Sequence, residues 1–223
     1  ACFEVLQDED LISATAQALS SGQVVGWFQG RMEFGPRALG NRSILADPRS
    51  ESMQRTLNMK IKFREGFRPF APAILYDHVG DWFDIDRASP YMLIVGHVVK
   101  HRQRPLSDRE KSLVGLDMLR TKRSEIPAVT HVDNSARIQT VTESGNSRFY
   151  ALLREFYKLS GCPVLANTSF NVRGEPIVHS PEDAFRCFMG TDMDMLVVGN
   201  CLLDKNRQRD DLKHQYAGEY EHD

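Results

Sequence analysis

The chain has few cysteines and no long apolar run, and these absences argue against several classes of protein. Its four cysteines show no CxxC spacing, so neither a zinc knuckle, a redox pair nor a disulfide framework is expected. Cys162 and Cys187 lie among apolar residues and are interpreted as buried thiols. No apolar stretch approaches the ~18–20 residues that a membrane-spanning helix needs. No signal peptide opens the sequence either, and a cytoplasmic protein is expected.

Neither sign of charge dominates, and the histidines do not cluster. The 28 basic and 30 acidic residues leave a formal net charge of −2, which argues against a protein that coats nucleic acid. The seven histidines form no HxxxH or HExxH pattern, so a metal site built by this chain alone is not expected. With 223 residues, 41% of them hydrophobic, the chain can bury a core without disulfides. It begins with Ala1 rather than Met, which suggests a piece of a longer protein.

Hydrophobic periodicity predicts helices alternating with strands, and therefore an α/β domain. Helices are predicted over 10–21, 50–59, 148–160 and 181–190, and strands over 24–28, 73–76, 91–99, 136–141, 164–166, 195–198 and 201–203. The continuous apolar run within 91–99 indicates a buried strand. The polar, basic segment 97–123 is interpreted as a flap or, preferably, a solvated surface loop. The domain is predicted to end near 205, with a polar, disordered tail over 206–223.

A segment rich in glycine and arginine, GRMEFGPRALGNRS at 30–43, follows the predicted strand 24–28. Its glycines allow the main chain to turn sharply and to approach a ligand. Its arginines, Arg31, Arg37 and Arg42, supply planar groups that match phosphate or carboxylate oxygens. The segment therefore predicts an anion site. Alternatively, these arginines form surface ion pairs with Glu33 and Asp47.

Two further segments add polar groups. In NMKIKFREGFRPFAP, at 58–72, cations alternate with apolar residues, which predicts an extended conformation with the cations on one face and the apolar side chains packed beneath. In PVLANTSFNVRGEPIV, at 163–178, a short apolar strand runs into a polar loop over 167–174. Its small polar side chains can either turn the backbone or bind ligand oxygens.

These segments and PAVTHVDNSARIQTV, at 127–141, resemble in this order the C-terminal domain of the O-carbamoyltransferases that modify nodulation factors and antibiotics such as tobramycin and cephamycin. The resemblance extends from about Gly22 to about Leu203. It implies a twisted, mixed sheet of the YrdC type with a concave, positively charged face. It also implies a larger N-terminal domain of the actin-like ATPase superfamily, which holds the acceptor and a metal and whose patterns are not found in this chain.

The resemblance implies that this domain converts carbamoyl phosphate and ATP, with Mg²⁺, into carbamoyl-adenylate. The N-terminal domain then passes the carbamoyl group to a hydroxyl of a sugar-containing acceptor. The implied ligands of carbamoyl phosphate and of the nucleotide phosphates are Arg37, Lys62 and Arg68. Those implied around the nucleotide phosphates and the carbamoyl group are Arg137, Asn167 and Ser169. Lys62, Arg68 and Ser169 are the implied catalytic residues.

Each of these residues also has a structural interpretation. Arg37 or Arg137 can be a buried guanidinium paired with Asp47 or Asp133, and an asparagine such as Asn167 is common in turns. No histidine or lysine stands beside Ser169 in the sequence, which predicts a positioning hydroxyl rather than a covalent nucleophile.

Two functions of other classes remain. One is a nucleotide- or RNA-binding module, which exposed aromatics among the cations would favour. The slightly acidic net charge argues against it, as does the expectation that Phe63, Phe67 and Phe70 are buried. The other is a docking and regulatory domain with a decayed site, but all four motifs are chemically intact. Neither a nucleic acid nor a membrane is expected as a partner.

Overall fold

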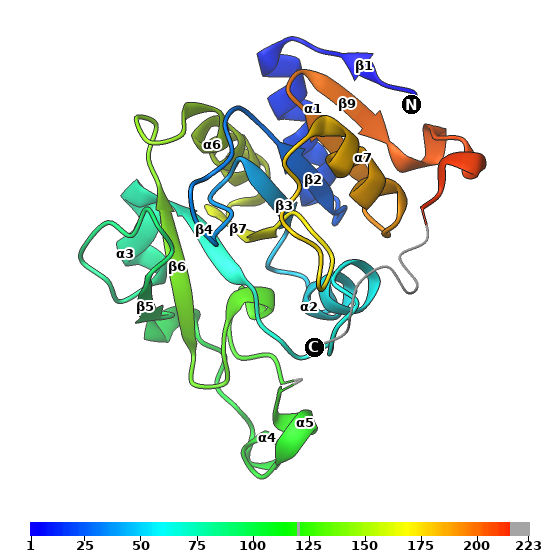
Figure 1. Ribbon diagram of the computed structural model, residues 1–223. Coiled ribbons are helices and arrows are strands. Elements are labelled where there is room, and N and C mark those ends of the chain that lie inside the picture. Colours follow the sequence, from blue (N-terminus) through cyan, green and yellow to red (C-terminus); the bar gives the residue numbers. More distant parts are fainter. Residues whose placement is uncertain (120, 215–223) are drawn as a thin grey trace.

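The computed structural model describes residues 1–119 and 121–214, in which nine strands form one mixed sheet (Figure 1). The strand order is β1-β9-β8-β2-β3-β7-β4-β6-β5. Two neighbouring pairs, β2 with β8 and β4 with β6, are parallel, and the others are antiparallel. The strands are β1 Glu4–Val5, β2 Val25–Phe28, β3 Arg42–Ala46, β4 Ala71–Leu75, β5 Ile94–His97, β6 Ser135–Val141, β7 Val164–Ser169, β8 Met195–Val198 and β9 Cys201–Asp204.

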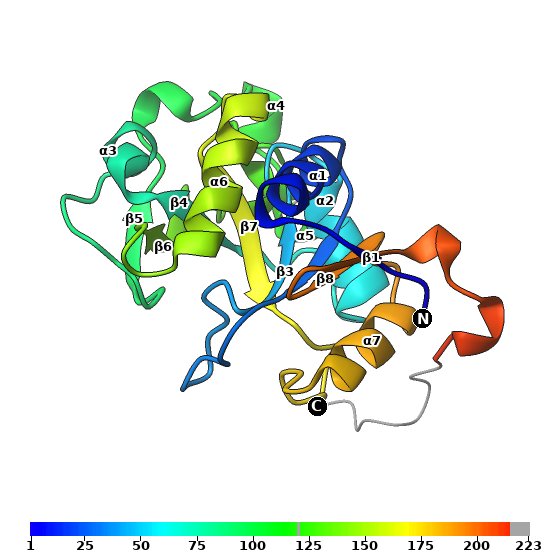
Figure 2. The same ribbon diagram turned by 90° about the horizontal axis from the view of Figure 1, so that it is seen from above.

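Helices lie on both sides of the sheet (Figure 2). On one side α1 (Asp8–Ser20) packs against α6 (Ser147–Ser160), and on the other α7 (Pro181–Met189) packs over β2 and β8. Because it is covered from both sides, β2 is buried along its whole length. The largest side chains of the core include Trp27, Phe149, Phe156, Phe170 and Phe188. Shorter helices are α2 (Met53–Thr56), α3 (Val79–Trp82), α4 (Asp108–Lys111) and α5 (Gly115–Leu119).

Most of the predicted helices and strands are present. Local signals mark the end of α6 and the beginning of α7. Gly161, in the left-handed conformation at φ +69°, ends α6. Ser180 begins α7, where its side chain and that of Asp183 form a reciprocal capping box. In α6, Leu152, Leu153 and Phe156 are buried, whereas Leu159 is 48% exposed. No strand was predicted at β3, which is buried at every position and pairs with both β2 and β7.

The predicted extended conformation of the second motif is wrong. Residues Leu57–Ile61 continue α2 as a π-helical turn. A helical path does not place every second residue on one face, so Lys62 turns inward and is only 4% exposed. Phe63 and Phe67 are 40% and 38% exposed, so their predicted burial is wrong as well, whereas Phe70 is buried.

The strand predicted over 91–99 is shorter and more exposed than expected. β5 lies at the end of the strand order and pairs with β6 alone. Leu93 and Val95 are 70% and 60% exposed. An apolar run favours a strand but does not say whether a second layer covers it, and the expectation of burial is therefore wrong.

Within the segment 97–123, His97 ends β5 and Val98 and Arg123 are buried, whereas α4 and α5 lie away from the sheet (Figure 1). Beyond β9 the chain forms two short 3₁₀ turns, Lys205–Arg207 and Asp210–Leu212. Arg207 forms an ion pair with Glu4, which joins the beginning of the predicted tail to the first strand. Residues 215–223 of that tail lie outside the described residues. Among the helices of residues 1–119 and 121–214, none has the length and hydropathy for a membrane span.

Candidate functional site

The loop between β2 and β3, residues 29–41, is held at its base by buried hydrogen bonds. Trp27 Nε1 donates to the carbonyl of Gly40 at 2.9 Å. The Arg42 guanidinium stacks on Phe28, 3.5 Å from the centre of the ring. It also donates to three carbonyls at the two ends of the loop, those of Gln29, Gly30 and Asn41. The loop therefore leaves the sheet in a fixed direction, and Figure 2 shows it standing away from the body of the molecule.

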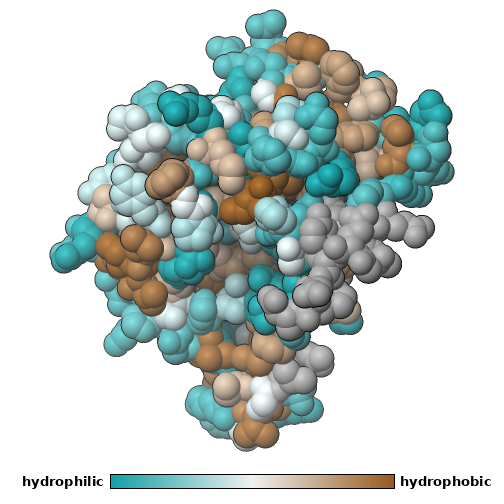
Figure 3. All heavy atoms as spheres, in the orientation of Figure 1, coloured by the Kyte–Doolittle hydropathy of each residue, from teal (hydrophilic) through white to brown (hydrophobic). Residues whose placement is uncertain are grey.

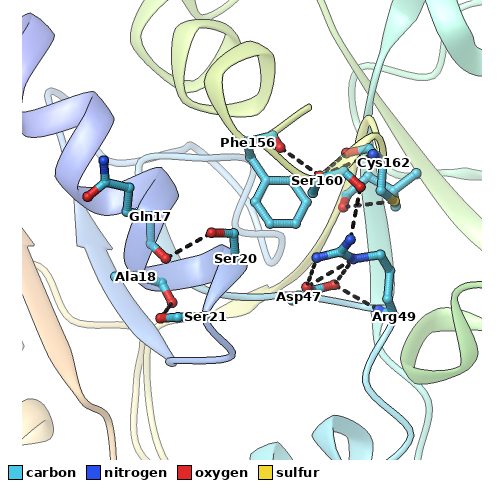
Figure 4. Close-up of polar contacts among 10 residues, drawn as sticks. Gln17, Ala18, Ser20, Ser21, Asp47, Arg49, Phe156, Ser160 and Cys162 are labelled. Carbon is cyan, nitrogen blue, oxygen red and sulfur yellow. Dashed lines mark hydrogen bonds and ion pairs between the residues drawn. The ribbon is translucent and has the colours of Figure 1, made fainter. Parts of the chain in front are cut away.

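The acidic groups near this loop already have partners. One oxygen of Glu33 accepts from two backbone N–H groups later in the loop, at 2.7 and 2.8 Å. Asp47 is bound by Arg49, whose Nη2 lies 2.6 Å from the carboxylate and whose Nη1 donates to the carbonyl of Ser160 (Figure 4). In the part of the chain that the structure describes, the alternative that Arg37 pairs with Asp47 is therefore wrong.

A polar cleft of about 200 Å³ lies where the motifs meet. The sheet brings them together, because Asn167 in β7 lies opposite Ala71 in β4, and β4 pairs with β6 on its other side. The side chains of interest in its lining are Arg37 from the loop, Arg64 from the second motif, Arg137 from β6, and Asn167 and Ser169 from β7.

Three guanidinium groups line this cleft, and within the described residues none of them forms an ion pair with a carboxylate. The Nε atom of Arg137 is buried without a hydrogen-bond partner. Burial lowers the pKa of Arg137, and the charge of Arg37 lowers it further. Burial also lowers the pKa of Arg64, which donates to Asn58 Oδ1 at 2.7 Å. Such uncompensated cations favour an anionic ligand.

Asn167 presents a hydrogen-bond acceptor beside these cations. Its side chain is buried, and its amide nitrogen donates to the carbonyl of Ala38 at 3.1 Å and to Gln139 Oε1 at 2.8 Å. The amide oxygen is buried without a partner. Because both amide hydrogens are used, the side chain can only accept a further bond, and a ligand with an N–H or O–H group would satisfy it.

Lys62 supports the third motif and is not among the residues that line the cleft. Its ammonium donates to the carbonyls of Ser169 and Asn171 and to Asn171 Oδ1, the last at 2.8 Å. Burial lowers the pKa of Lys62 to about 7. In this arrangement Lys62 holds the turn that follows β7, and so it positions Ser169.

Ser169 lies between the cleft and this lysine. Its Oγ donates to Asn171 Oδ1 at 2.6 Å and is 3.2 Å from Lys62 Nζ. The fold thus places beside Ser169 a lysine that lies far away in the sequence. Because the hydroxyl donates to Asn171 Oδ1 and accepts from Lys62 Nζ, the contact does not have the geometry of a base taking a proton from a nucleophile.

The remaining predicted residue, Arg68, is half exposed and pairs with Glu65, with Nε 3.1 Å from the carboxylate. It is not among the cleft-lining residues. Asp133 accepts from the backbone of Ser135 at 3.0 Å, and no ion pair joins it to Arg137 among the described residues.

Four of the six predicted site residues thus meet at the cleft: Arg37, Arg137, Asn167 and Ser169. Arg64 is not among the residues that the resemblance implies, although the predicted extended path places it on the same face as Lys62. A helical interpretation of 57–61, with Leu57 and Ile61 four residues apart as inward positions, would have separated the two cations.

Residues 16–205 match the family model described as Carbamoyltransferase C-terminus. The chain belongs to this family.

Curated relatives of this carbamoyltransferase C-terminal domain are longer proteins. An uncharacterised protein of Synechocystis is 58% identical over 93% of the chain, which spans 34% of that protein. Nodulation protein NolNO of Sinorhizobium fredii is 42% identical over 91% of the chain and 27% of its own length. The 3'-hydroxymethylcephem-O-carbamoyltransferase of Streptomyces clavuligerus is 38% identical over 84% of the chain and 32% of its length. The chain therefore spans about a third or less of these relatives.

Solved structures confirm the predicted fold class. Full-length HypF, described as phosphate- and nucleotide-bound, is similar with a TM-score of 0.55 at 16% identity, over 85% of this chain and 25% of HypF. HypF from T. kodakarensis gives a TM-score of 0.51. The domain accordingly has the mixed α/β architecture of the YrdC type.

Proposed function

We propose that this domain forms carbamoyl-adenylate from carbamoyl phosphate and ATP. The observation that carries the proposal is the cleft in which Arg37, Arg64 and Arg137 have no acidic partner among the described residues, next to the unpaired amide oxygen of Asn167. Guanidinium groups match the oxygens of phosphates. The amide of a carbamoyl group supplies the N–H donors that Asn167 Oδ1 accepts.

The chemistry then needs positioning and charge neutralisation more than covalent help. Water releases inorganic phosphate from carbamoyl phosphate, and an oxygen of the resulting carbamate attacks the α-phosphorus of ATP while pyrophosphate leaves. The arginines would stabilise the negative charge that develops during the attack. Lys62 would act as a positioning residue through Ser169, and Arg68 would guide anions near the cleft.

Mg²⁺ would enter with ATP rather than be bound beforehand by the domain. The cleft lining contains guanidinium, amide and hydroxyl groups but no carboxylate, and Mg²⁺ favours carboxylate and phosphate oxygens. Within residues 1–119 and 121–214 no group of three metal-binding side chains is found. The oxygens of the triphosphate would therefore coordinate the ion in place of protein carboxylates.

We further propose that this chain is part of a longer protein, as the matching region is in the relatives. The remaining part of that protein would transfer the carbamoyl group. That part would be the N-terminal domain of the actin-like ATPase superfamily, acting on a hydroxyl of a sugar-containing acceptor. The S. clavuligerus relative is, by its name, an O-carbamoyltransferase.

The test is the release of pyrophosphate from ATP and Mg²⁺ by the chain, with and without carbamoyl phosphate. Release that depends on carbamoyl phosphate is expected. Asn167→Leu should reduce it, because the variant lacks the amide acceptor, whereas Arg109→Met on the exposed surface should not. Release that does not require carbamoyl phosphate, or that is unchanged in Asn167→Leu, would contradict the assignment.

A nucleotide- or RNA-binding module is the second candidate, because Phe63 and Phe67 are exposed beside Arg64 and Arg68. Exposed aromatics among cations are typical of single-strand binding surfaces. Titration with a single-stranded RNA at increasing salt distinguishes the two. RNA binding that is lost in Phe63→Ser and Phe67→Ser, without any pyrophosphate release, would favour this second function.

A further inference from the structure

We propose that two apolar side chains at the sheet edge, Leu93 and Val95, hold the planar base of the nucleotide whose phosphates enter the cleft. We call this pair the β5 shelf. The inference rests on the proposed function, because it extends the same site from the phosphates to the base and assigns the residues that distinguish a nucleotide from a plain polyphosphate.

Strand register places the shelf directly beside the cleft. Val95 in β5 lies opposite Arg137 in β6, and paired residues project from the same side of a sheet. Neighbouring strands are ~5 Å apart, so Val95 lies one strand farther toward the sheet edge than Arg137, which lines the cleft. Leu93 immediately precedes β5 and stands two positions before Val95, the spacing that places side chains on one face of an extended chain.

The two shelf side chains are exposed to solvent and lie next to the charged cleft. Leu93 is 70% exposed and Val95 60% exposed. In Figure 3 apolar surface is visible on the side of the molecule where β5 lies. A nucleobase has apolar faces and a phosphate-bearing end, so its chemistry matches an apolar surface that continues into a group of guanidiniums.

The backbone at Met92 gives a second, independent observation. Met92 has φ +55°, a left-handed conformation that is uncommon for a residue other than glycine. Its side chain is buried, and its sulfur lies 3.8 Å from Arg137 Nη2. Strained backbone of this kind clusters at ligand sites. Here it turns Met92 under Arg137 and leaves the next residue, Leu93, outside.

The hydrogen bonds at the outer edge of β5 favour a small ligand over an added strand. The backbone N–H of Asp84 donates to the carbonyl of His97 at 2.9 Å, and a carboxylate oxygen of Asp84 accepts from the N–H of His97. These bonds occupy the outward backbone groups of His97, at the end of β5, which a strand from a second chain would need there.

The experiment compares the affinity of the chain for MgATP with its affinity for magnesium tripolyphosphate by calorimetry. The wild-type chain should bind MgATP at least tenfold more tightly. The double variant Leu93→Ser with Val95→Ser should bring this ratio close to one without changing the affinity for tripolyphosphate. Val114→Ser removes an apolar side chain that is 81% exposed elsewhere, and it should leave the ratio as in the wild type.

The outcomes separate this inference from the proposed function. Equal affinity of the wild type for both ligands, or an unchanged ratio in the double variant, overturns the shelf and leaves the anion site standing. Binding of neither ligand removes the proposed function and the shelf with it. The double variant could instead keep the wild-type affinity ratio and show only a smaller mass by light scattering. That result would show that the surface joins two copies of the chain and would overturn the inference.

Discussion

Lys62 and Arg64 stand two residues apart, yet their side chains do different things. Lys62 is buried and donates to the turn after β7, whereas Arg64 lines the cleft without forming an ion pair within the described residues. A buried cation surrounded by carbonyl oxygens supports structure, and a partly buried cation without an acidic partner favours a ligand. This difference predicts opposite results for substitutions at the two kinds of position.

Arg137→Met should weaken binding of MgATP at least tenfold while leaving stability unchanged or higher. The guanidinium is desolvated and forms no ion pair among the described residues, so its removal takes away a cost of folding along with the ligand contact. Calorimetry and thermal unfolding of the same samples check both parts. A clear loss of stability together with intact binding would instead make Arg137 structural.

Lys62→Met should lower the free energy of unfolding by about 2 kcal/mol at alkaline pH, because several oxygen acceptors lose their donor. The pKa of Lys62 is about 7 in the folded chain and about 10.4 when unfolded. Between these values the unfolded state binds more protons, so the lysine's contribution to stability rises with pH. Denaturant titrations at pH 7 and pH 10 should show a larger difference between wild type and variant at pH 10. An equal difference at both values would show that burial does not lower this pKa.

Ser169→Ala should slow carbamoyl-adenylate formation by about 10²–10³ without abolishing it, as loss of a positioning contact does. The hydroxyl donates to Asn171 and therefore does not direct its proton at Lys62. Mass spectrometry of the wild-type chain during turnover should find no added group on the peptide containing Ser169. A carbamoylated or adenylylated Ser169 would establish covalent catalysis instead.

Among the elements, the 29–41 loop depends most on glycine. Gly40 has φ +111°, and a Cβ atom there would lie 2.3 Å from the ring of Phe149 in α6. Gly35 has φ +142° but no atom within 4 Å of the equivalent position. The first glycine is needed for close packing as well as for its backbone conformation, and the second for its conformation only.

Gly40→Ala should therefore destabilise the chain by more than Gly35→Ala, which carries only backbone strain of about 1–3 kcal/mol. Gly40→Ala should also weaken binding of tripolyphosphate, because Arg37 and Ala38 are displaced with the base of the loop. Chemical denaturation and calorimetry measure the two effects. Equal destabilisation by both variants would mean that Phe149 moves aside and that the loop is not fixed by this contact.

At the scale of the whole molecule, the sheet assembles the cleft, but the chain covers only about a third or less of its relatives. The cleft-lining residues come from the β2–β3 loop, the segment before β4, and strands β6 and β7. All of them lie within residues 16–205, the range that matches the family model, so the proposed anion site lies within this domain. The acceptor site, as proposed, is not.

The chain by itself should therefore release pyrophosphate in a carbamoyl phosphate-dependent manner but should carbamoylate no alcohol. Chromatography of reactions that contain sugar alcohols checks this, with the S. clavuligerus relative and its cephem substrate as a positive control. A carbamoylated sugar made by this chain alone would show that the acceptor site lies here.

The sequence by itself determined the family, the α/β class and most of the elements, because helix caps, glycine stops and strand alternation are local. Gly161 and Ser180 mark helix ends without any knowledge of the fold. Only the tertiary structure decided which cations face the cleft, whether β5 is covered, and that a lysine lies beside Ser169. These depend on pairings between segments distant in sequence, chiefly β7 with β4 and β6 with β5, and on the helical path that sends Lys62 inward. No local pattern carries that information, because the same apolar or basic run is compatible with a buried, an exposed or a ligand-facing position.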